Sequence, residues 1–226
     1  MKVVIACSKS WFIPSNYLKK NHQILFIKEK KELTTENIKK FNPNLVFFPH
    51  WSWKVSNEIH QEYKCILFHT APLPFGRGGS PIQNLILNGF KESPVCALKM
   101  VEELDSGPIY SKRYISLEGS LSSIFKRLNI IVNDLIEELI VFLPEPINQK
   151  GNNYYFKRLN LDDNKIPDKG SLKEFYDRVR MIDDANYPNS FIRYGDYIIE
   201  FNKAELVDGK IICKAHIRLY GDKYNV

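Results

Sequence analysis

Short apolar runs alternate with amphipathic segments along the first 70 residues. Four runs have the length of buried strands, and three segments between them have helical spacing. We expect strands at 2–8, 22–28, 44–49 and 64–69, and helices at 11–20, 34–41 and 54–62. This alternation predicts an α/β fold with a Rossmann-like, mostly parallel sheet flanked by helices. Ligands bind such sheets beyond the carboxyl ends of the strands, so the loops that begin at Ser8, His50 and His69 are candidate site loops.

The next stretch predicts two helices around a pair of strands. Ser80 is a good helix cap, and Pro81 suits the first helical position. Apolar residues recur at helical spacing after residue 120, which indicates a long amphipathic helix. The expected elements are a helix at 80–90, strands at 94–101 and 107–116 joined by an acidic turn, and a helix at 121–142.

Two prolines, Pro144 and Pro146, stop the long helix, and the polar stretch that follows is typical of a boundary. The sequence therefore predicts a main domain, residues 1–146, and a small C-terminal helix-and-strand subdomain, residues 147–226. Within the subdomain we expect a helix at 171–183 and strands at 193–202 and 210–217, with a turn at Asp208-Gly209 between the strands.

The composition of the 226 residues is that of an ordinary globular protein, because 44% are apolar and 26% are charged. A net charge of +6 favours an anionic partner such as a nucleotide, a phosphate or a nucleic acid. The lysines are scattered, however, which is more typical of a solvated surface. Polar residues interrupt MKVVIACS too early for a signal peptide or a membrane span, and no GxGxxG follows the first strand to indicate a dinucleotide.

The four cysteines lie far apart in apolar runs and lack the spacing of metal ligands. We expect Cys7, Cys65, Cys96 and Cys213 to be buried free thiols. Such thiols imply a reducing, cytoplasmic location, and they give no indication of a metal.

His69 and Asp105 are the residues most suited to proton chemistry. His69 ends an expected strand, and Asp105 lies in a later turn from which a carboxylate can orient an imidazole. A His–Asp pair supports proton transfer to or from an attacking group. The pair alone is of low specificity, because a lone histidine is often a core residue and ordinary turns favour aspartate.

Two strings provide a more specific context. HTAPLPFGRGGSPIQNLILNG, with ELDSGPIY later in the chain, resembles the folate-dependent formyltransferase family. That family includes methionyl-tRNA formyltransferase, phosphoribosylglycinamide formyltransferase and the sugar N-formyltransferases. The matching residues are His69, Leu73-Pro74, Gly76 to Gly79, Pro81 to Gln83, Leu104-Asp105 and Gly107. The likeness covers residues 1–140, and VRMIDDANYPNSFI at 179–192 is similar to the segment after the catalytic domain in several members.

The resemblance implies transfer of a formyl group from 10-formyltetrahydrofolate to a primary amine, without a metal. His69 and Asp105 match the family's catalytic His and Asp, which supply a base for the amine proton and a donor for the oxyanion.

The relatives' folate pocket falls on Trp51, Trp53, Leu73, Pro74 and Asp105, although the Trp-Ser-Trp run is equally compatible with anchoring a loop in the core. The candidate acceptor-binding residues are Ser8, Lys9, Ser10, Arg77, Gly78, Gly79 and Ser80. A flexible surface arginine is the competing interpretation of Arg77.

One position departs from the family's pattern. The family has an asparagine two residues before the catalytic histidine, and this chain has Leu67, which cannot donate a hydrogen bond to an oxyanion. We expect His50, at the end of the neighbouring strand, to substitute as a third catalytic residue, while an exposed loop histidine is the competing interpretation. The leucine also leaves open a folate-binding relative without activity.

The number of residues after the long helix helps to choose between the possible acceptors of the formyl group. About 80 residues follow it and carry no dense basic stripe, so tRNA or another nucleic acid is not favoured. We expect the acceptor to be a nucleotide-linked amino sugar of surface polysaccharide or O-antigen biosynthesis, with methionyl-tRNA or another amine as the alternative. The sequence indicates no membrane partner and leaves a homodimer open.

Overall fold

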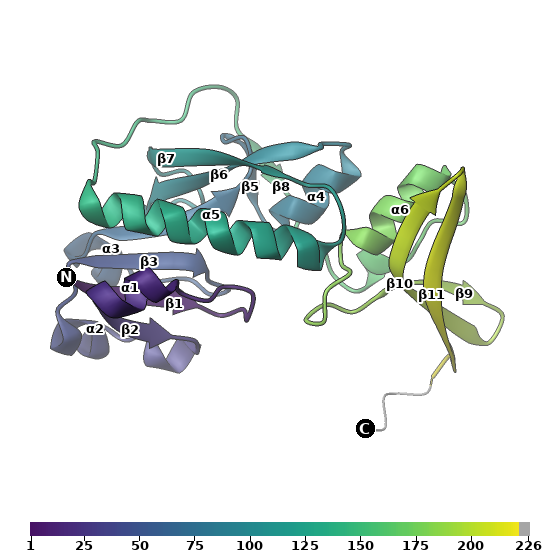
Figure 1. Ribbon diagram of the computed structural model, residues 1–226, viewed down its shortest axis with the longest axis horizontal. Coiled ribbons are helices and arrows are strands. Elements are labelled where there is room, and N and C mark those ends of the chain that lie inside the picture. The colour runs from purple at the N-terminus through teal and green to yellow at the C-terminus, as the bar shows by residue number, and fades with distance from the viewer. Residues whose placement is uncertain (222–226) are drawn as a thin grey trace.

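The computed structural model describes residues 1–221 and has a six-stranded sheet at its centre (Figure 1). The strand order is β2-β1-β3-β4-β6-β7. The first four of these strands pair in parallel, and β6 and β7 add an antiparallel edge. The strands are β2 (Gln23–Ile27), β1 (Lys2–Cys7), β3 (Leu45–His50), β4 (Cys65–Thr70), β6 (Glu92–Lys99) and β7 (Ile109–Ser116). The predicted α/β fold is confirmed.

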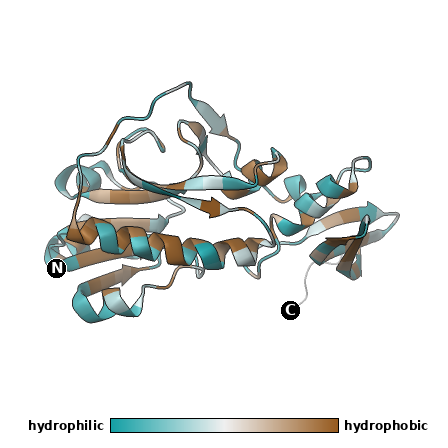
Figure 2. Cartoon of the chain, turned by 45° about the horizontal axis from the view of Figure 1, so that its top comes forward, coloured by the Kyte–Doolittle hydropathy of each residue, from teal (hydrophilic) through white to brown (hydrophobic). Residues whose placement is uncertain are grey.

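Helices cover both faces of this sheet, because the central strands are apolar on both sides. In β1, Val3 and Ile5 join one buried cluster, and Val4 and Ala6 join the other. The first cluster includes helices α1 (Asn16–Asn21), α4 (Pro81–Leu87) and α5 (Leu121–Val141), and the second includes α2 (Thr35–Phe41) and α3 (Asn57–Glu62). The long helix α5 carries both apolar and polar residues along its length, as a helix with one buried face should (Figure 2).

A smaller set of elements follows α5 at one end of the molecule (Figure 1). Strand β8 (Tyr154–Phe156) returns to the main part and pairs in parallel with the short strand β5 (Phe75–Gly78). The remaining elements are α6 (Leu172–Arg180) and a three-stranded sheet of β9 (Ser190–Tyr194), β10 (Tyr197–Val207) and β11 (Lys210–Leu219), with short 3₁₀ turns at Lys30–Glu32 and Asp162–Asn164.

Several expected elements differ from the structure. The helix expected at 11–20 begins only at Asn16, because Ser15 caps it and the residue before Pro14 is disfavoured in a helix. The run at 193–202 is not one strand, since Gly195 turns the chain between β9 and β10. Cys213 is half-buried, whereas the other three cysteines are buried as expected. Burial raises the pKa values of Cys7 and Cys96 to about 11, which keeps these thiols protonated.

The segment after α5 lies against the main part of the molecule. Ile147 forms an isolated bridge with Ile109, and β8 pairs with β5. The division at residue 146 therefore stays a prediction. Within residues 1–221, no helix is long and apolar enough to cross a membrane, and no cluster of His, Cys, Asp and Glu could hold a metal ion.

Candidate active site

His69 lies at the carboxyl end of β4, and its side chain is 7% exposed. Its Nε2 is 2.8 Å from the carbonyl oxygen of Gly76, and its Nδ1 is 3.4 Å from Oδ2 of Asp105. Both partner atoms are hydrogen-bond acceptors, so a neutral ring, which carries one N–H, donates to only one of them at a time. The pairing of His69 with Asp105 that the sequence suggested is present.

The turn that carries Asp105 is held in a fixed shape. Asp105 is 8% exposed and adopts a left-handed backbone conformation with φ of 52°. Its Oδ2 also accepts the backbone N–H of Gly78 at 2.9 Å. One carboxylate oxygen therefore connects His69 to the glycine-rich loop.

The glycine-rich loop packs closely against β8 and the residues that follow it. Gly78 has φ of 95°, and a Cβ there would lie 2.8 Å from the carbonyl oxygen of Phe156. A Cβ at Gly79 would lie 2.5 Å from Cβ of Arg158. Only glycine fits both the conformation and the close approach at Gly78. The hydroxyl of Ser80 accepts from the backbone of Leu159, so Gly79 and Ser80 also support the segment after β8.

Arg77 is not a flexible surface side chain. It is 5% exposed, and its Nε and Nη2 donate to Oε1 of Gln149 at 3.1 and 2.9 Å. Its Nη1 donates to Glu103 and to the hydroxyl of Tyr155. Gln149 in turn donates from Nε2 to the carbonyl oxygens of Asp105 and Gly107 at 2.8 and 2.9 Å. Arg77 thus acts through Gln149 on the backbone of the Asp105 turn.

His50 ends β3, the strand next to β4, at the same edge of the sheet as His69. Its ring meets Trp11 edge to face, with centroids 6.3 Å apart. Burial lowers the pKa of His50 to about 4, and the positive charges of Lys9 and Arg158 add to this effect. The ring is therefore neutral at pH 7 and retains one N–H to donate. Its role as a third catalytic residue stays a prediction.

The loop after β1 approaches the same edge. Ser8 donates its backbone N–H to the carbonyl oxygen of His50 at 2.8 Å, and its hydroxyl lies 2.9 Å from that of Ser52. Lys9 places its ammonium group 5.3 Å from the centre of the Tyr187 ring. Ser10 is exposed and bonds to Asn186. These residues lie at the edge that the sequence indicated, and their binding roles stay predictions.

Aromatic and apolar side chains gather beside Leu67. Trp51, Leu67 and Met100 pack against the cluster that contains α2 and α3, and Trp53 meets Trp51 edge to face at 5.0 Å. The indole Nε1 of Trp51 is buried and has no hydrogen-bond partner within the described residues. An apolar floor with one free donor fits the ring of a folate, which offers acceptor atoms on a flat aromatic body. Pro74, another residue expected at the folate pocket, is buried, and its carbonyl oxygen accepts from the backbone N–H of Tyr154.

Sequence reasoning missed Gln149 and Arg158. Gln149 lies in a polar stretch that is typical of a linker, and Arg158 comes 53 residues after Asp105 in the chain. The only available signal was the polar character of the segment itself. Their positions depend on the pairing of β8 with β5, and the spacing of apolar residues in the sequence does not predict this pairing.

Comparison with known proteins shows which family the chain resembles. The family model described as formyl transferase matches residues 7–128, and the model described as methionyl-tRNA formyltransferase, C-terminal domain, matches residues 161–218. A methionyl-tRNA formyltransferase from Malacoplasma penetrans is 26% identical over 227 residues, which cover 87% of this chain and 69% of the relative. The chain spans 60 to 69% of the length of the first three curated relatives that it matches.

Solved structures extend the likeness to the whole chain. A structure described as methionyl-tRNA formyltransferase from Clostridium thermocellum is 40% identical, has a TM-score of 0.93, and covers 97% of this chain and 99% of its own. An N-formyltransferase from Helicobacter canadensis, in complex with folinic acid and dTDP-3-aminofucose, is 18% identical with a TM-score of 0.62 and covers 96% and 100%. The second likeness shows the fold alone. With a family model that matches more than half of its residues, the chain belongs to the formyl transferase family.

Proposed function

We propose that the protein transfers a formyl group from 10-formyltetrahydrofolate to the amino group of a nucleotide-linked amino sugar. The observation that carries this proposal is the buried His69–Asp105 pair, which sits at the carboxyl edge of the sheet within the family's motif. The pair supplies proton transfer at a place where both a donor and an acceptor can approach.

In the proposed reaction, the folate donor supplies the formyl group and the protein's residues handle the proton. When bound, 10-formyltetrahydrofolate supplies an activated formyl group. Asp105 holds the imidazole of His69 in place, because its carboxylate faces Nδ1. His69 then takes the proton that the attacking amine must lose, or donates to the oxygen on which negative charge develops. The buried position excludes water from both groups.

His50 is the residue that we expect to act in place of the missing family asparagine. Leu67 packs in an apolar cluster and has no polar atom to offer. The neutral ring of His50 retains an N–H at the same sheet edge. A His50→Gln variant that keeps an N–H donor should retain more activity than His50→Phe, and equal activities of the two variants would contradict this role.

The charge of the C-terminal part favours a small acceptor over tRNA. Residues 147–226 contain 14 Lys and Arg against 12 Asp and Glu. Several of the cations there are paired within the molecule, such as Arg180 and Lys173 with the buried Asp177. Binding to a phosphate backbone requires unpaired positive charge over a surface.

Methionyl-tRNA is the second candidate acceptor. The match of residues 161–218 to the C-terminal domain of methionyl-tRNA formyltransferase and the 40% identity to the Clostridium thermocellum structure favour it. Both candidates share the formyl donor and the catalytic pair, and they differ in the acceptor alone.

One assay separates the candidates. Purified protein is given 10-formyltetrahydrofolate with a panel of UDP-, dTDP-, GDP- and CMP-linked amino sugars, and in parallel with initiator methionyl-tRNA. We expect the mass of one formyl group on a nucleotide sugar and no formyl-methionyl-tRNA. Formylation of tRNA alone would overturn the sugar proposal, and no product with any acceptor would overturn the activity.

A further inference from the structure

A groove lies beside the edge strand β2, outside the catalytic residues. Its volume is about 680 Å³, which is within the range of small-ligand pockets. It exists because α1 has only six residues and leaves part of β2 uncovered. One end of the groove, at Ser8, Lys9 and Ser10, reaches the edge of the sheet where His50 and His69 lie.

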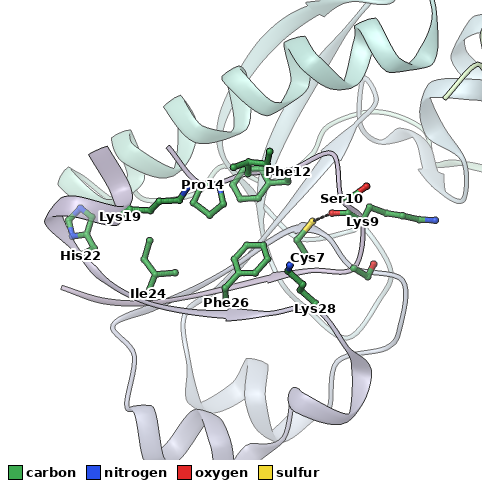
Figure 3. A pocket seen from close by; sticks show the side chains of 12 residues that line it. Cys7, Lys9, Ser10, Phe12, Pro14, Lys19, His22, Ile24, Phe26 and Lys28 are labelled. Carbon is green, nitrogen blue, oxygen red and sulfur yellow. Dashed lines mark hydrogen bonds between the residues drawn. The ribbon is translucent and has the colours of Figure 1, made fainter. Parts of the chain in front are cut away.

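The middle of the groove is apolar and its ends are basic. Ile24 and Phe26 rise from β2 toward Phe12 and Pro14 on the opposite wall (Figure 3). Lys19 and His22 lie at one end, and Lys9 and Lys28 lie at the other. No Asp or Glu is among the twelve lining residues. Glu137, which acts electrostatically on His22, accepts a hydrogen bond from Ser15.

Two polar features of the groove suit a ligand with both rings and charges. The Nε2 of His22 is buried and has no hydrogen-bond partner within residues 1–221, so a ligand atom can pair with it. At the catalytic end, Lys9 and Arg158 both act on His50 electrostatically, so two cations lie near the edge between the groove and His69.

We infer that the groove binds the nucleoside of the acceptor, with its diphosphate held at the catalytic end by Lys9, Lys28 and Arg158. The flat apolar walls fit a base and a ribose, and the lysines complement the phosphates. Strands β2 and β4 are three strand spacings apart, on the order of 14 Å, which leaves room for a diphosphate and a sugar to span the distance to His69. This inference rests on the proposed function, because it names the nucleotide part of that acceptor.

Direct binding tests the groove separately from catalysis. Calorimetry measures the Kd of UDP, dTDP, GDP and CMP for the full chain, and for a Lys19→Glu/Lys28→Glu variant whose altered side chains are exposed. The matched control is Lys20→Glu/Lys30→Glu, because these lysines are exposed neighbours that do not line the groove. We expect one of the four nucleotides to bind the full chain, with Kd raised at least about tenfold in the groove variant and changed less than about twofold in the control.

Two results would overturn the inference. One is equal weakening by the groove and control variants, and the other is formylation of a nucleotide sugar by a protein that binds none of the four nucleotides. Binding that depends on Lys19 and Lys28, in a protein that formylates no nucleotide sugar, would support the groove and contradict the proposed activity. A His69→Gln variant is expected to keep nucleotide binding while it loses transfer.

Discussion

His50 has a pKa far from that of an ordinary histidine, and this shift makes a prediction about stability. Burial lowers its pKa from 6.5 to about 4, so between these pH values the unfolded chain binds a proton that the folded chain does not. The free energy of unfolding is therefore unaffected by this group above pH 6.5 and falls as the pH drops toward 4, by on the order of 3 kcal/mol. Urea unfolding from pH 4.5 to 7.5 measures this slope. In His50→Gln the slope should be smaller by the contribution of this histidine, with His60→Gln on the outer helix α3 as the control. If the free energy of unfolding depended on pH in the same way in wild type and His50→Gln, the lowered pKa of His50 would be contradicted.

Residues 142–153, between α5 and β8, form a segment that we call the strap, and its Gln149 bonds to the backbone of the Asp105 turn. Replacing Gln149 by Leu removes two bonds to the backbone of the Asp105 turn and leaves the buried Arg77 with fewer partners. We expect the free energy of unfolding to fall by about 1 to 3 kcal/mol and kcat to fall about tenfold or more, because Asp105 loses its fixed position. Asn153→Ala, an exposed change in the same strap, should leave both unchanged. A Gln149→Leu variant with wild-type kcat and lowered stability would show that the strap is only structural.

The pairing of β5 with β8 makes a second prediction at the scale of elements. Gly78→Ala combines φ of 95° with a Cβ 2.8 Å from a backbone oxygen, so we expect a loss of about 2 to 4 kcal/mol in the free energy of unfolding. Gly195→Ala shares a positive φ, but its Cβ would meet nothing within 4 Å, so it should cost only about 1 kcal/mol. Thermal and urea unfolding of the two variants compares them. Equal losses would mean that the close approach to β8 is not what requires glycine.

The sequence predicted the parts of the molecule that local patterns determine. His69 was placed correctly because it ends a continuous apolar run, and α5 because its apolar spacing is regular over 21 residues. The burial of Arg77 could not be predicted from local sequence patterns, because its partner Gln149 is 72 residues away in a stretch typical of a linker. The third strand of the C-terminal sheet was missed because the turn at Gly195 falls inside an otherwise strand-like run.

At the scale of the whole molecule, two mostly separate surfaces meet at one edge of the sheet. Trp51 and Leu67 belong to the face covered by α2 and α3, where we propose that the folate binds. Phe12 and Ile24 belong to the face covered by α1 and α5, which carries the groove. The buried His69–Asp105 pair lies at the carboxyl edge where ligands from both faces can meet. We propose that this pair moves the proton during formyl transfer.

The rate of formylated product formation, with wild type and His69→Gln side by side, tests that claim most directly. Product is followed by mass spectrometry at saturating 10-formyltetrahydrofolate and nucleotide sugar, and calorimetry confirms that both proteins still bind their ligands. We predict that kcat falls by roughly 10² to 10⁴ in the variant, with ligand binding retained. A His69→Gln protein that forms the product at the wild-type rate would contradict it.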